Sequence, residues 1–341
     1  MNTNPKISVV MTVYNGERFL AEAIESILNQ TFSDFEFIIV DNNSTDKTKD
    51  IIRSYKDDRI SLIENKENLG QTKALNIGIR NSRAELIARM DADDISLLQR
   101  LALQYEYLNS NPSVAVVGSW HKEIDARGRH LKYFRMPTDP IEIKCYMVSP
   151  GELSYYCVSH PTVLMRKDVL YDVGLYDENY RLQDYELWVR IVRKYKIANM
   201  GKFLLKRRMY LNQQTKEFRG VIDSESEKII SSNIKYYFPE VCDSELRVLI
   251  RMFQYKPQGS KEDGLRVIDA FGCFFEKYSQ SNEKAIITRK LQSKMVLFYI
   301  PQLTKTNLSY SLKQLTKNFC NYPLSIFEAK FYRKAVKAMF S

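Results

Sequence analysis

Apolar strand patterns alternate with helical patterns over residues 1–120, and polar clusters follow three of the strands. Ile7–Tyr14 and Phe35–Val40 are mostly apolar and rich in β-branched residues, which is typical of strands buried on both faces. The alternation predicts an α/β fold with a doubly wound, mostly parallel, Rossmann-like sheet, whose ligands lie beyond the carboxyl ends of the strands. Further elements are expected as strands at Ile60–Ile63, Glu85–Met90 and Val114–Val117, and as helices at Lys47–Tyr55, Gly70–Arg80 and from the cap Ser96 to Leu108.

The pattern changes after residue 120. Arg127-Gly128 indicates a hairpin turn, and strands are expected at His160–Met165 and Phe203–Arg208. Tyr185–Tyr195 has the spacing of a helix. From about Ser224 onward the pattern is helical and rich in Tyr, Phe and Lys. We therefore expect an α/β domain over residues 1–220, with a regular half (1–120) and a mixed half (121–220), and a helical extension over 221–341.

Charge is distributed unevenly along the 341 residues. Residues 1–200 hold 26 Lys and Arg against 28 Asp and Glu, whereas residues 201–341 hold 25 against 13. Residues 281–341 alone carry 11 basic against 2 acidic residues. This basic part is compatible with an anionic partner such as phospholipid headgroups, and equally with a solvated surface. Net charge is all that favours nucleic acid, so no nucleic-acid partner is expected.

Composition excludes several classes of protein. With 44% hydrophobic and 27% charged residues, the chain is neither collagen-like nor wholly disordered. Its longest apolar runs, such as Met295–Ile300, fall far short of the ~20 residues that a membrane span requires. Five cysteines lack any CxxC spacing, and Met1–Lys6 has no signal-peptide pattern. These features predict a cytoplasmic protein without a disulfide framework.

Two aspartates, Asp91 and Asp93, follow the strand expected at Glu85–Met90, with one residue between them. Carboxylate oxygens at a sheet edge can hold Mg²⁺ or Mn²⁺ and leave positions for the phosphates of a ligand. The alternative is a polar loop that only caps the next helix, a task for which Asp94 and Ser96 would suffice. Asp91 and Asp93 are therefore candidate residues of a divalent metal site.

Polar residues at two other strand ends, and at one helix start, have the chemistry of a nucleotide site. Thr12 and Tyr14 end the first strand and Asp41 follows the second, so the three are expected in one crevice. A carboxylate there can accept a hydrogen bond from a nucleobase or ribose, and Tyr14 offers a flat face to a base. Asp41 is equally suited to forming a turn. Gly70, followed by Lys73, suits contact with a diphosphate, although Lys73 can also be an ordinary solvated lysine.

Asp184 stands at the start of the helix that carries Trp188. A carboxylate in this position can act as a general base toward a hydroxyl nucleophile. It can also serve as the N-cap of the helix, and spacing does not separate the two roles. Trp188 lies on the apolar face of that helix and is expected in the core.

Together these segments resemble the inverting nucleotide-sugar enzymes of glycosyltransferase family 2. The resemblance covers about residues 5–210 and rests on the order of five segments: ISVVMTVYNGERFLAEAIESILNQTFSDFEFIIVDNNSTDKT, NLGQTKALNIGI, ARMDADDISLLQRL, HPTVLMRKDVLYDVGLYDE and QDYELWVRI. It implies the GT-A fold, with a nucleotide-sugar half over 1–120 and an acceptor half over 121–220. The basic, aromatic-rich helical extension expected over 221–341 lies outside the resemblance.

The resemblance also implies roles for matched residues. Thr12 and Asp41 would contact the nucleoside, and Asp91 would face the ribose or the water shell of the metal. Asp93 would bind a divalent metal, Mn²⁺ or Mg²⁺. Asp184 would be the general base of the acceptor site.

The chain departs from the family pattern at several positions. Asn42 stands where a second Asp is common, which leaves the base preference open, and Arg208-Met209-Tyr210 replaces a frequent Arg-x-His. The QxxRW segment of processive synthases is absent, since no Arg precedes Trp120 or Trp188. His160 lies in a recurring segment, where a structural hydrogen bond is at least as compatible as a functional role.

The implied activity is transfer of one sugar from a nucleoside-diphosphate sugar, by default a UDP-sugar, to a hydroxyl of a glycan or lipid-linked acceptor. The implied setting is bacterial surface polysaccharide synthesis. The basic charge of residues 281–341 slightly favours contact with the inner face of the cytoplasmic membrane over a helical cover for the catalytic domain or an oligomer contact. Two alternatives stay open: another metal-dependent nucleotide enzyme, and a non-catalytic glycosyltransferase-like scaffold that binds a protein partner. The weakly cationic loop after the first strand counts against the former, and Asp41, Asp93 and Asp184 count against the latter.

Overall fold

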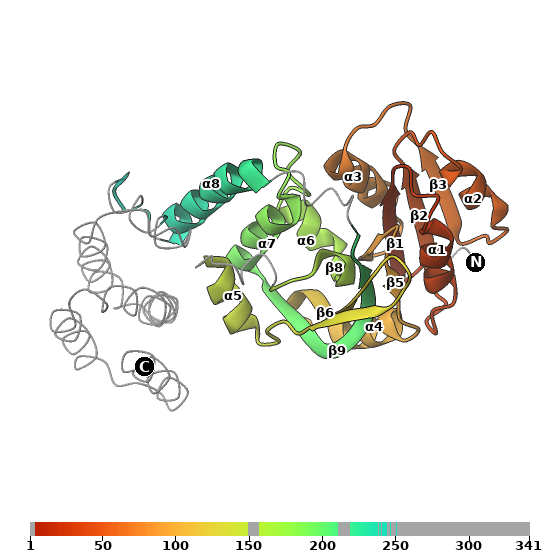
Figure 1. Ribbon diagram of the computed structural model, residues 1–341. Coiled ribbons are helices and arrows are strands. Elements are labelled where there is room, and N and C mark those ends of the chain that lie inside the picture. Colours follow the sequence, from red (N-terminus) through yellow and green to blue (C-terminus); the bar gives the residue numbers. More distant parts are fainter. Residues whose placement is uncertain are drawn as a thin grey trace, which may run out of the picture. The chain divides into compact units, whose positions relative to one another are not determined.

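The computed structural model describes residues 4–148, 157–210 and 219–237, with isolated positions at 239, 241–243, 246 and 250 (Figure 1). The chain divides into two compact units, Met1–Met147 with Tyr155–Ile229, and Val148–Ser154 with Ile230–Ser341. The expectations for the basic segment 281–341 and most of the extension lie outside the described residues. The described helices include none that is long and apolar enough to cross a bilayer.

A single mixed sheet organises the first unit. Its strand order is β3-β2-β1-β4-β8-β6-β9-β5, with β7 paired to β6. β1 lies between β2 and β4, and these three strands and β3 run parallel, as do β6 and β9; β8, β7 and β5 pair antiparallel. The strands are β1 (Ile7–Val13), β2 (Phe35–Asp41), β3 (Ile60–Glu64), β4 (Leu86–Asp91), β5 (Ile95–Ser96), β6 (Val114–Ile124), β7 (His130–Phe134), β8 (Leu164–Arg166) and β9 (Lys196–Arg208).

Helices cover both faces of this sheet, so the predicted doubly wound α/β architecture is confirmed (Figure 1). One apolar cluster joins the sheet to α1, α2 and α4, and another joins it to α3, α6 and α7. The helices are α1 (Leu20–Leu28), α2 (Thr48–Ser54), α3 (Gln71–Asn81), α4 (Arg100–Ser110), α5 (Pro140–Val148), α6 (Lys167–Asp172), α7 (Gln183–Lys194) and α8 (Arg219–Tyr237), with the 3₁₀ helix η2 at His160–Thr162.

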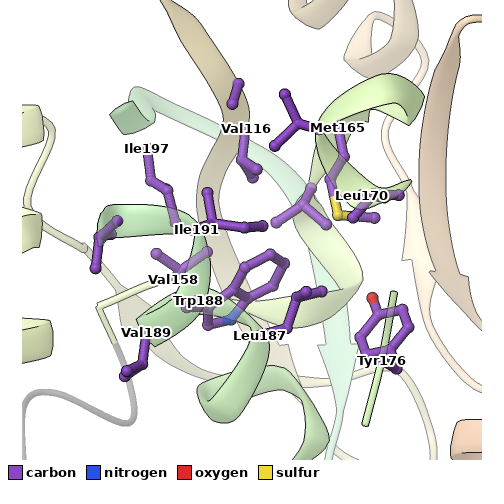
Figure 2. Close-up of a cluster of buried hydrophobic side chains, with 14 of the residues drawn as sticks. Val116, Val158, Met165, Leu170, Tyr176, Leu187, Trp188, Val189, Ile191 and Ile197 are labelled. Atoms are coloured by element: carbon purple, nitrogen blue, oxygen red, sulfur yellow. The ribbon is translucent and has the colours of Figure 1, made fainter. Parts of the chain in front are cut away.

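Trp188 is buried in the second of these clusters, as the sequence predicts. Figure 2 shows its indole among apolar side chains from several elements, including Met165 of β8, Leu170 of α6 and Ile197 of β9. Burial of such large side chains stabilises the fold by about 25 cal/mol for each Å² of apolar surface removed from water. Helix α7 is therefore anchored firmly along the face that carries Trp188.

Three local predictions are wrong. Ser96 does not cap a helix, because it belongs to β5 and pairs with Leu205 of β9, and α4 begins only at Arg100. The segment His160–Thr162 forms a 3₁₀ helix rather than the start of a strand. β6 and β9 extend well past the expected ends of Val114–Val117 and Phe203–Arg208, because the two strands pair with each other over most of their length. The hairpin at Arg127-Gly128 is confirmed.

A buried arginine, Arg100, forms hydrogen bonds that connect α4 to the neighbouring strands of the sheet. Its Nη2 donates to the carbonyl of Arg89 on β4 at 2.7 Å and to that of Val163 at 3.3 Å, and its Nε donates to Gln104 Oε1 at 3.1 Å. Gln104 in turn donates to the carbonyls of Val117 and Thr162. These bonds join α4, β4, β6 and the segment before β8.

Candidate active site

The carboxyl ends of three neighbouring strands meet at one edge of the sheet. Thr12 on β1 is in register with Asp91 on β4, and Val13 is in register with Asp41 on β2. The parallel pairing of adjacent strands dictates this arrangement, because equivalent strand ends then lie side by side. Three of the residues with expected nucleotide contacts, Thr12, Asp41 and Asp91, thus lie on adjacent strands at one sheet edge.

Asp41 is fully buried and accepts a hydrogen bond from the backbone N–H of Ser44 at 3.1 Å. Its neighbour Asn42 acts as donor and acceptor at once: its Nδ2 donates to Asn68 Oδ1 at 2.7 Å, and its Oδ1 accepts from Leu69 N–H at 3.0 Å. An aspartate at position 42 could not make the first bond when ionised. The departure to Asn42 therefore fastens the 65–70 loop to the end of β2.

Two of the residues predicted to bind the nucleotide-sugar lie near the surface. Tyr14 follows β1 and is 45% exposed, so its ring is accessible to a ligand. Lys73 is exposed in the first turn of α3, three residues after Gly70, whose φ of 80° is left-handed. Glycine adopts that backbone conformation without strain. Among the described residues, Lys73 forms no ion pair with Asp91, Asp93 or Asp94, so its role stays a prediction.

Three carboxylates cluster at the end of β4. Each of Asp91, Asp93 and Asp94 offers an oxygen that lies within 4.8 Å of the others. Asp94 is buried, and its Oδ2 has no hydrogen-bond partner among the described residues. Burial, reinforced by the charges of Asp91 and Asp93, raises the pKa of the Asp94 carboxyl well above its usual range. A divalent cation would relieve this crowding of negative charge, so the residues present fit such an ion.

Residues at the end of β9 and directly after it form hydrogen bonds with this acid cluster. The backbone N–H of Arg208 donates to Asp94 Oδ1 at 2.8 Å, and its Nε donates to the carbonyl of Asp93 at 2.9 Å. The hydroxyl of Tyr210 donates to Asp93 Oδ2 at 2.9 Å. Arg208-Met209-Tyr210, the segment that replaces the frequent Arg-x-His, therefore contacts two of the three acids directly.

Arg89 is a site residue that the sequence predictions missed. Its side chain is only 3% exposed and forms an ion pair with Asp91, two residues along the same strand face. Burial by itself would lower the pKa of Arg89, but the adjacent Asp91 carboxylate raises it. Its Nε is buried without a hydrogen-bond partner among the described residues. The available signal was a single charged residue within the otherwise apolar run Leu86–Met90.

Asp184 is the second residue of α7, and Leu182 occupies the N-cap position. The N-cap alternative for Asp184 is therefore wrong, although its Oδ1 accepts from the backbone N–H of Tyr185 at 2.8 Å. Desolvation raises the pKa of the Asp184 carboxyl, and the charge of Arg89 opposes that rise. Because Arg89 also pairs with Asp91, the two aspartates share one cationic neighbour.

His160 makes the structural hydrogen bond that the sequence allowed. Its Nε2 lies 2.7 Å from the hydroxyl of Tyr176, and both side chains are buried. Burial lowers the pKa of His160 well below its usual range, and the nearby charge of Arg89 lowers it further. The imidazole is therefore neutral at physiological pH.

The mixed, mostly parallel sheet with helices on both faces matches the GT-A fold of glycosyltransferases. The sequence profile described as "Glycosyl transferase family 2" matches residues 8–174. An uncharacterized glycosyltransferase of Methanocaldococcus jannaschii is 38% identical over 210 residues, which are 60% of this chain and 71% of the relative. This chain belongs to glycosyltransferase family 2.

Two further likenesses agree with that assignment. The O-antigen biosynthesis glycosyltransferase WbnJ of Escherichia coli is 32% identical over 220 residues, or 62% of this chain and 82% of WbnJ. A crystal structure of S. aureus TarS in complex with UDP-GlcNAc superposes with a TM-score of 0.57 at 16% identity, covering 92% of this chain and 89% of that one. The TarS likeness establishes the shared GT-A fold.

Proposed function

We propose that this chain is an inverting transferase that moves one sugar from a nucleoside-diphosphate sugar, by preference a UDP-sugar, to a hydroxyl of a glycan or lipid-linked acceptor. The observation that carries the proposal is the strand register, which gathers Thr12, Asp41 and Asp91 at the edge where the acid cluster lies. The O-antigen role in the name of WbnJ, and the UDP-GlcNAc bound to TarS, support a surface-polysaccharide setting and a UDP-linked donor.

The donor residues would bind and orient the nucleotide. The Asp41 carboxylate would accept from the base or ribose, Thr12 would contact the nucleoside, and Tyr14 would stack on the base. Lys73 would lie beside the diphosphate, where its positive charge would neutralise part of the negative charge of the phosphates. Held by Asp93, with Asp91 alongside, Mn²⁺ or Mg²⁺ would neutralise the charge that develops on the leaving diphosphate.

Asp184 would supply the base. As the acceptor oxygen attacks the anomeric carbon, its proton passes to the Asp184 carboxylate and the bond from that carbon to the diphosphate oxygen breaks. A single displacement of this kind inverts the configuration. The raised pKa of Asp184 makes its carboxylate a stronger proton acceptor than an exposed aspartate, provided that the working pH keeps it ionised.

Thermal unfolding with UDP, GDP, dTDP and CDP, each with and without Mn²⁺, tests the donor site. A nucleotide at ~100 times its dissociation constant stabilises the folded state by about 2.7 kcal/mol. We expect a Mn²⁺-dependent rise in melting temperature with UDP. A rise with another nucleotide would replace the UDP assignment, and the absence of any rise would favour the non-catalytic scaffold.

We also propose that the enzyme works in the cytoplasm and contacts anionic membrane through residues 281–341, which contain 11 basic and 2 acidic residues. Sedimentation of the full chain with vesicles that contain phosphatidylglycerol tests this contact. Binding at low salt that weakens at high salt is expected. A chain that stays in the supernatant at low salt would contradict it.

A further inference from the structure

Glu225 of helix α8 accepts hydrogen bonds from the backbone at the start of helix α7. Oε2 of Glu225 accepts hydrogen bonds from the backbone N–H groups of Arg181 at 2.9 Å and Leu182 at 3.0 Å. Leu182 is the N-cap of α7, and Asp184 lies two residues further on. A side chain more than 40 positions away in the sequence therefore holds the backbone directly before the proposed base.

The start of α7 needs such an acceptor. Backbone N–H groups at the beginning of a helix have no partner within the helix, and Leu182 has no side chain that can cap them. A carboxylate is well suited to the task, because hydrogen bonds to an ionised acceptor are stronger than neutral ones and the helix start carries partial positive charge. Glu225 thus supplies an acceptor to the backbone N–H of the N-cap residue Leu182 and to that of the preceding Arg181.

Two other contacts fix the same region. Ile229, one turn after Glu225 on α8, is buried in the apolar cluster that includes Trp188 of α7. At the start of α3, Gln71 Oε1 accepts from Gln183 Nε2 at 3.3 Å. The first turn of α7 is therefore held between α3, which carries Lys73, and α8.

We propose that Glu225 is a positioning residue for the acceptor site: its two hydrogen bonds fix the start of α7 and thereby the place of the Asp184 carboxyl. This inference rests on the proposed function, in which Asp184 is the general base. Misplacing a reacting group by about 1 Å can lower a rate by about 10²-fold, so a distant contact of this kind can control the rate without touching substrate.

Hydrogen exchange measured on the full chain by mass spectrometry tests the contact without any substrate. In Glu225→Ala, the amides of a peptide covering residues 177–188 should exchange about tenfold faster or more, because the two N–H groups lose their acceptor. Glu225→Gln, which keeps an acceptor oxygen but no charge, should lie between this variant and wild type. Lys228→Ala, at an exposed position of the same helix, is the control and should match wild type. Unchanged exchange in Glu225→Ala would overturn the proposal.

Nucleotide release from UDP-, GDP-, dTDP- and CDP-glucose, with water as the acceptor, tests the effect on the base. Glu225→Ala should lower kcat by about tenfold to 10²-fold while the dissociation constant of the nucleotide changes by less than about twofold. In an Asp184→Asn background, the same substitution should have no further effect. If Glu225→Ala lowers kcat by the same factor in the Asp184→Asn background as in wild type, Glu225 does not act through Asp184 and the proposal fails. A wild-type rate in Asp184→Asn would refute the base itself, and the exchange data would then show that the Glu225 contact exists without that role.

Discussion

The hydroxyl group of Tyr210 donates a hydrogen bond to Oδ2 of Asp93 at 2.9 Å, across a sequence separation of 117 residues. The ring of Tyr210 also lies against that of Phe19, with 5.3 Å between centroids. Tyr210 therefore links the loop after β1, the acid cluster after β4 and the end of β9. It stands where related enzymes often carry a histidine, so this chain supplies a phenol at its acid cluster.

Tyr210→Phe should lower the free energy of unfolding by about 1.5–3 kcal/mol without metal, because a partly buried carboxylate loses its donor. Saturating Mn²⁺ should reduce this difference, since the cation gives Asp93 another partner. Urea unfolding with and without Mn²⁺ measures both quantities. Tyr171→Phe, which removes the hydroxyl of an exposed tyrosine, should unfold like wild type. Equal stability of Tyr210→Phe and wild type without metal would contradict the expectation.

Asp93→Asn and Asp184→Asn should separate donor binding from transfer. Asp93→Asn removes a charge from the acid cluster and should abolish the Mn²⁺-dependent stabilisation by UDP. Asp184→Asn should keep that stabilisation and lower the transfer rate by about 10²–10⁴-fold, the usual contribution of a general base. Calorimetric titration with UDP and an assay of UDP release measure the two effects. The assignment fails if both variants lose the same property.

The raised pKa of Asp184 has a consequence for stability. Between the unfolded value of about 3.9 and the higher folded value, the native state binds more protons than the unfolded state. The free energy of unfolding therefore falls as the pH rises through this window. Asp184→Asn removes the titration, so it should be more stable than wild type at pH 7, and the advantage should shrink toward about pH 4.

Asp172 provides a control of opposite sign. Its hydrogen bond from Lys194, together with that from Tyr195, lowers the pKa of the Asp172 carboxyl. Its contribution to stability is present above the unfolded pKa and lost at lower pH, so Asp172→Asn should be less stable than wild type at pH 7. Urea unfolding between pH 4 and pH 7 measures both variants. A pH-independent difference for Asp184→Asn would show that burial of its charge costs nothing.

Arg100→Met should lower stability by about 2–5 kcal/mol, because the carbonyl of Arg89 and the amide oxygen of Gln104 lose their donor in a buried place. Burial lowers the pKa of Arg100 to about 9, yet it stays charged at neutral pH. Arg80→Met, at an exposed position of α3, should change stability by less than about 0.5 kcal/mol. Thermal and urea unfolding measure both, and similar losses in the two variants would contradict the expectation.

The four parallel strands β1 to β4 were predictable from the sequence to within a residue or two. The expected strands Ile7–Tyr14 and Phe35–Val40 correspond to β1 (Ile7–Val13) and β2 (Phe35–Asp41). Strands buried on both faces leave a continuous apolar run, and that signal is local. β5 leaves none, because the two residues Ile95 and Ser96 are extended only through their pairing with β9, more than 100 positions away.

The residues of the candidate site likewise fall into those that a local sequence signal could identify and those that it could not. Asp91 and Asp93 could be chosen because they directly follow a strand, and parallel topology brings such positions together. Arg89, Tyr210 and Glu225 were not chosen, because each acquires its role from a partner supplied by the fold. Two of those partners are remote in sequence, and no periodicity in the chain encodes them. The roles of the chosen residues stay predictions until the variants above are measured.

The hydrogen bond from Arg208 to Asp94 determines when the acid cluster can be completed during synthesis of the chain. The ribosome adds Arg208 114 residues after Asp94, an interval on the order of ten seconds at 5–20 residues per second. During that interval the strands β1 to β4 can pair, but three crowded carboxylates lack the backbone donor, guanidinium and phenol that later accompany them. We therefore expect the emerging chain to form the proposed nucleotide site early and to complete its acid cluster only when residue 210 has left the exit tunnel.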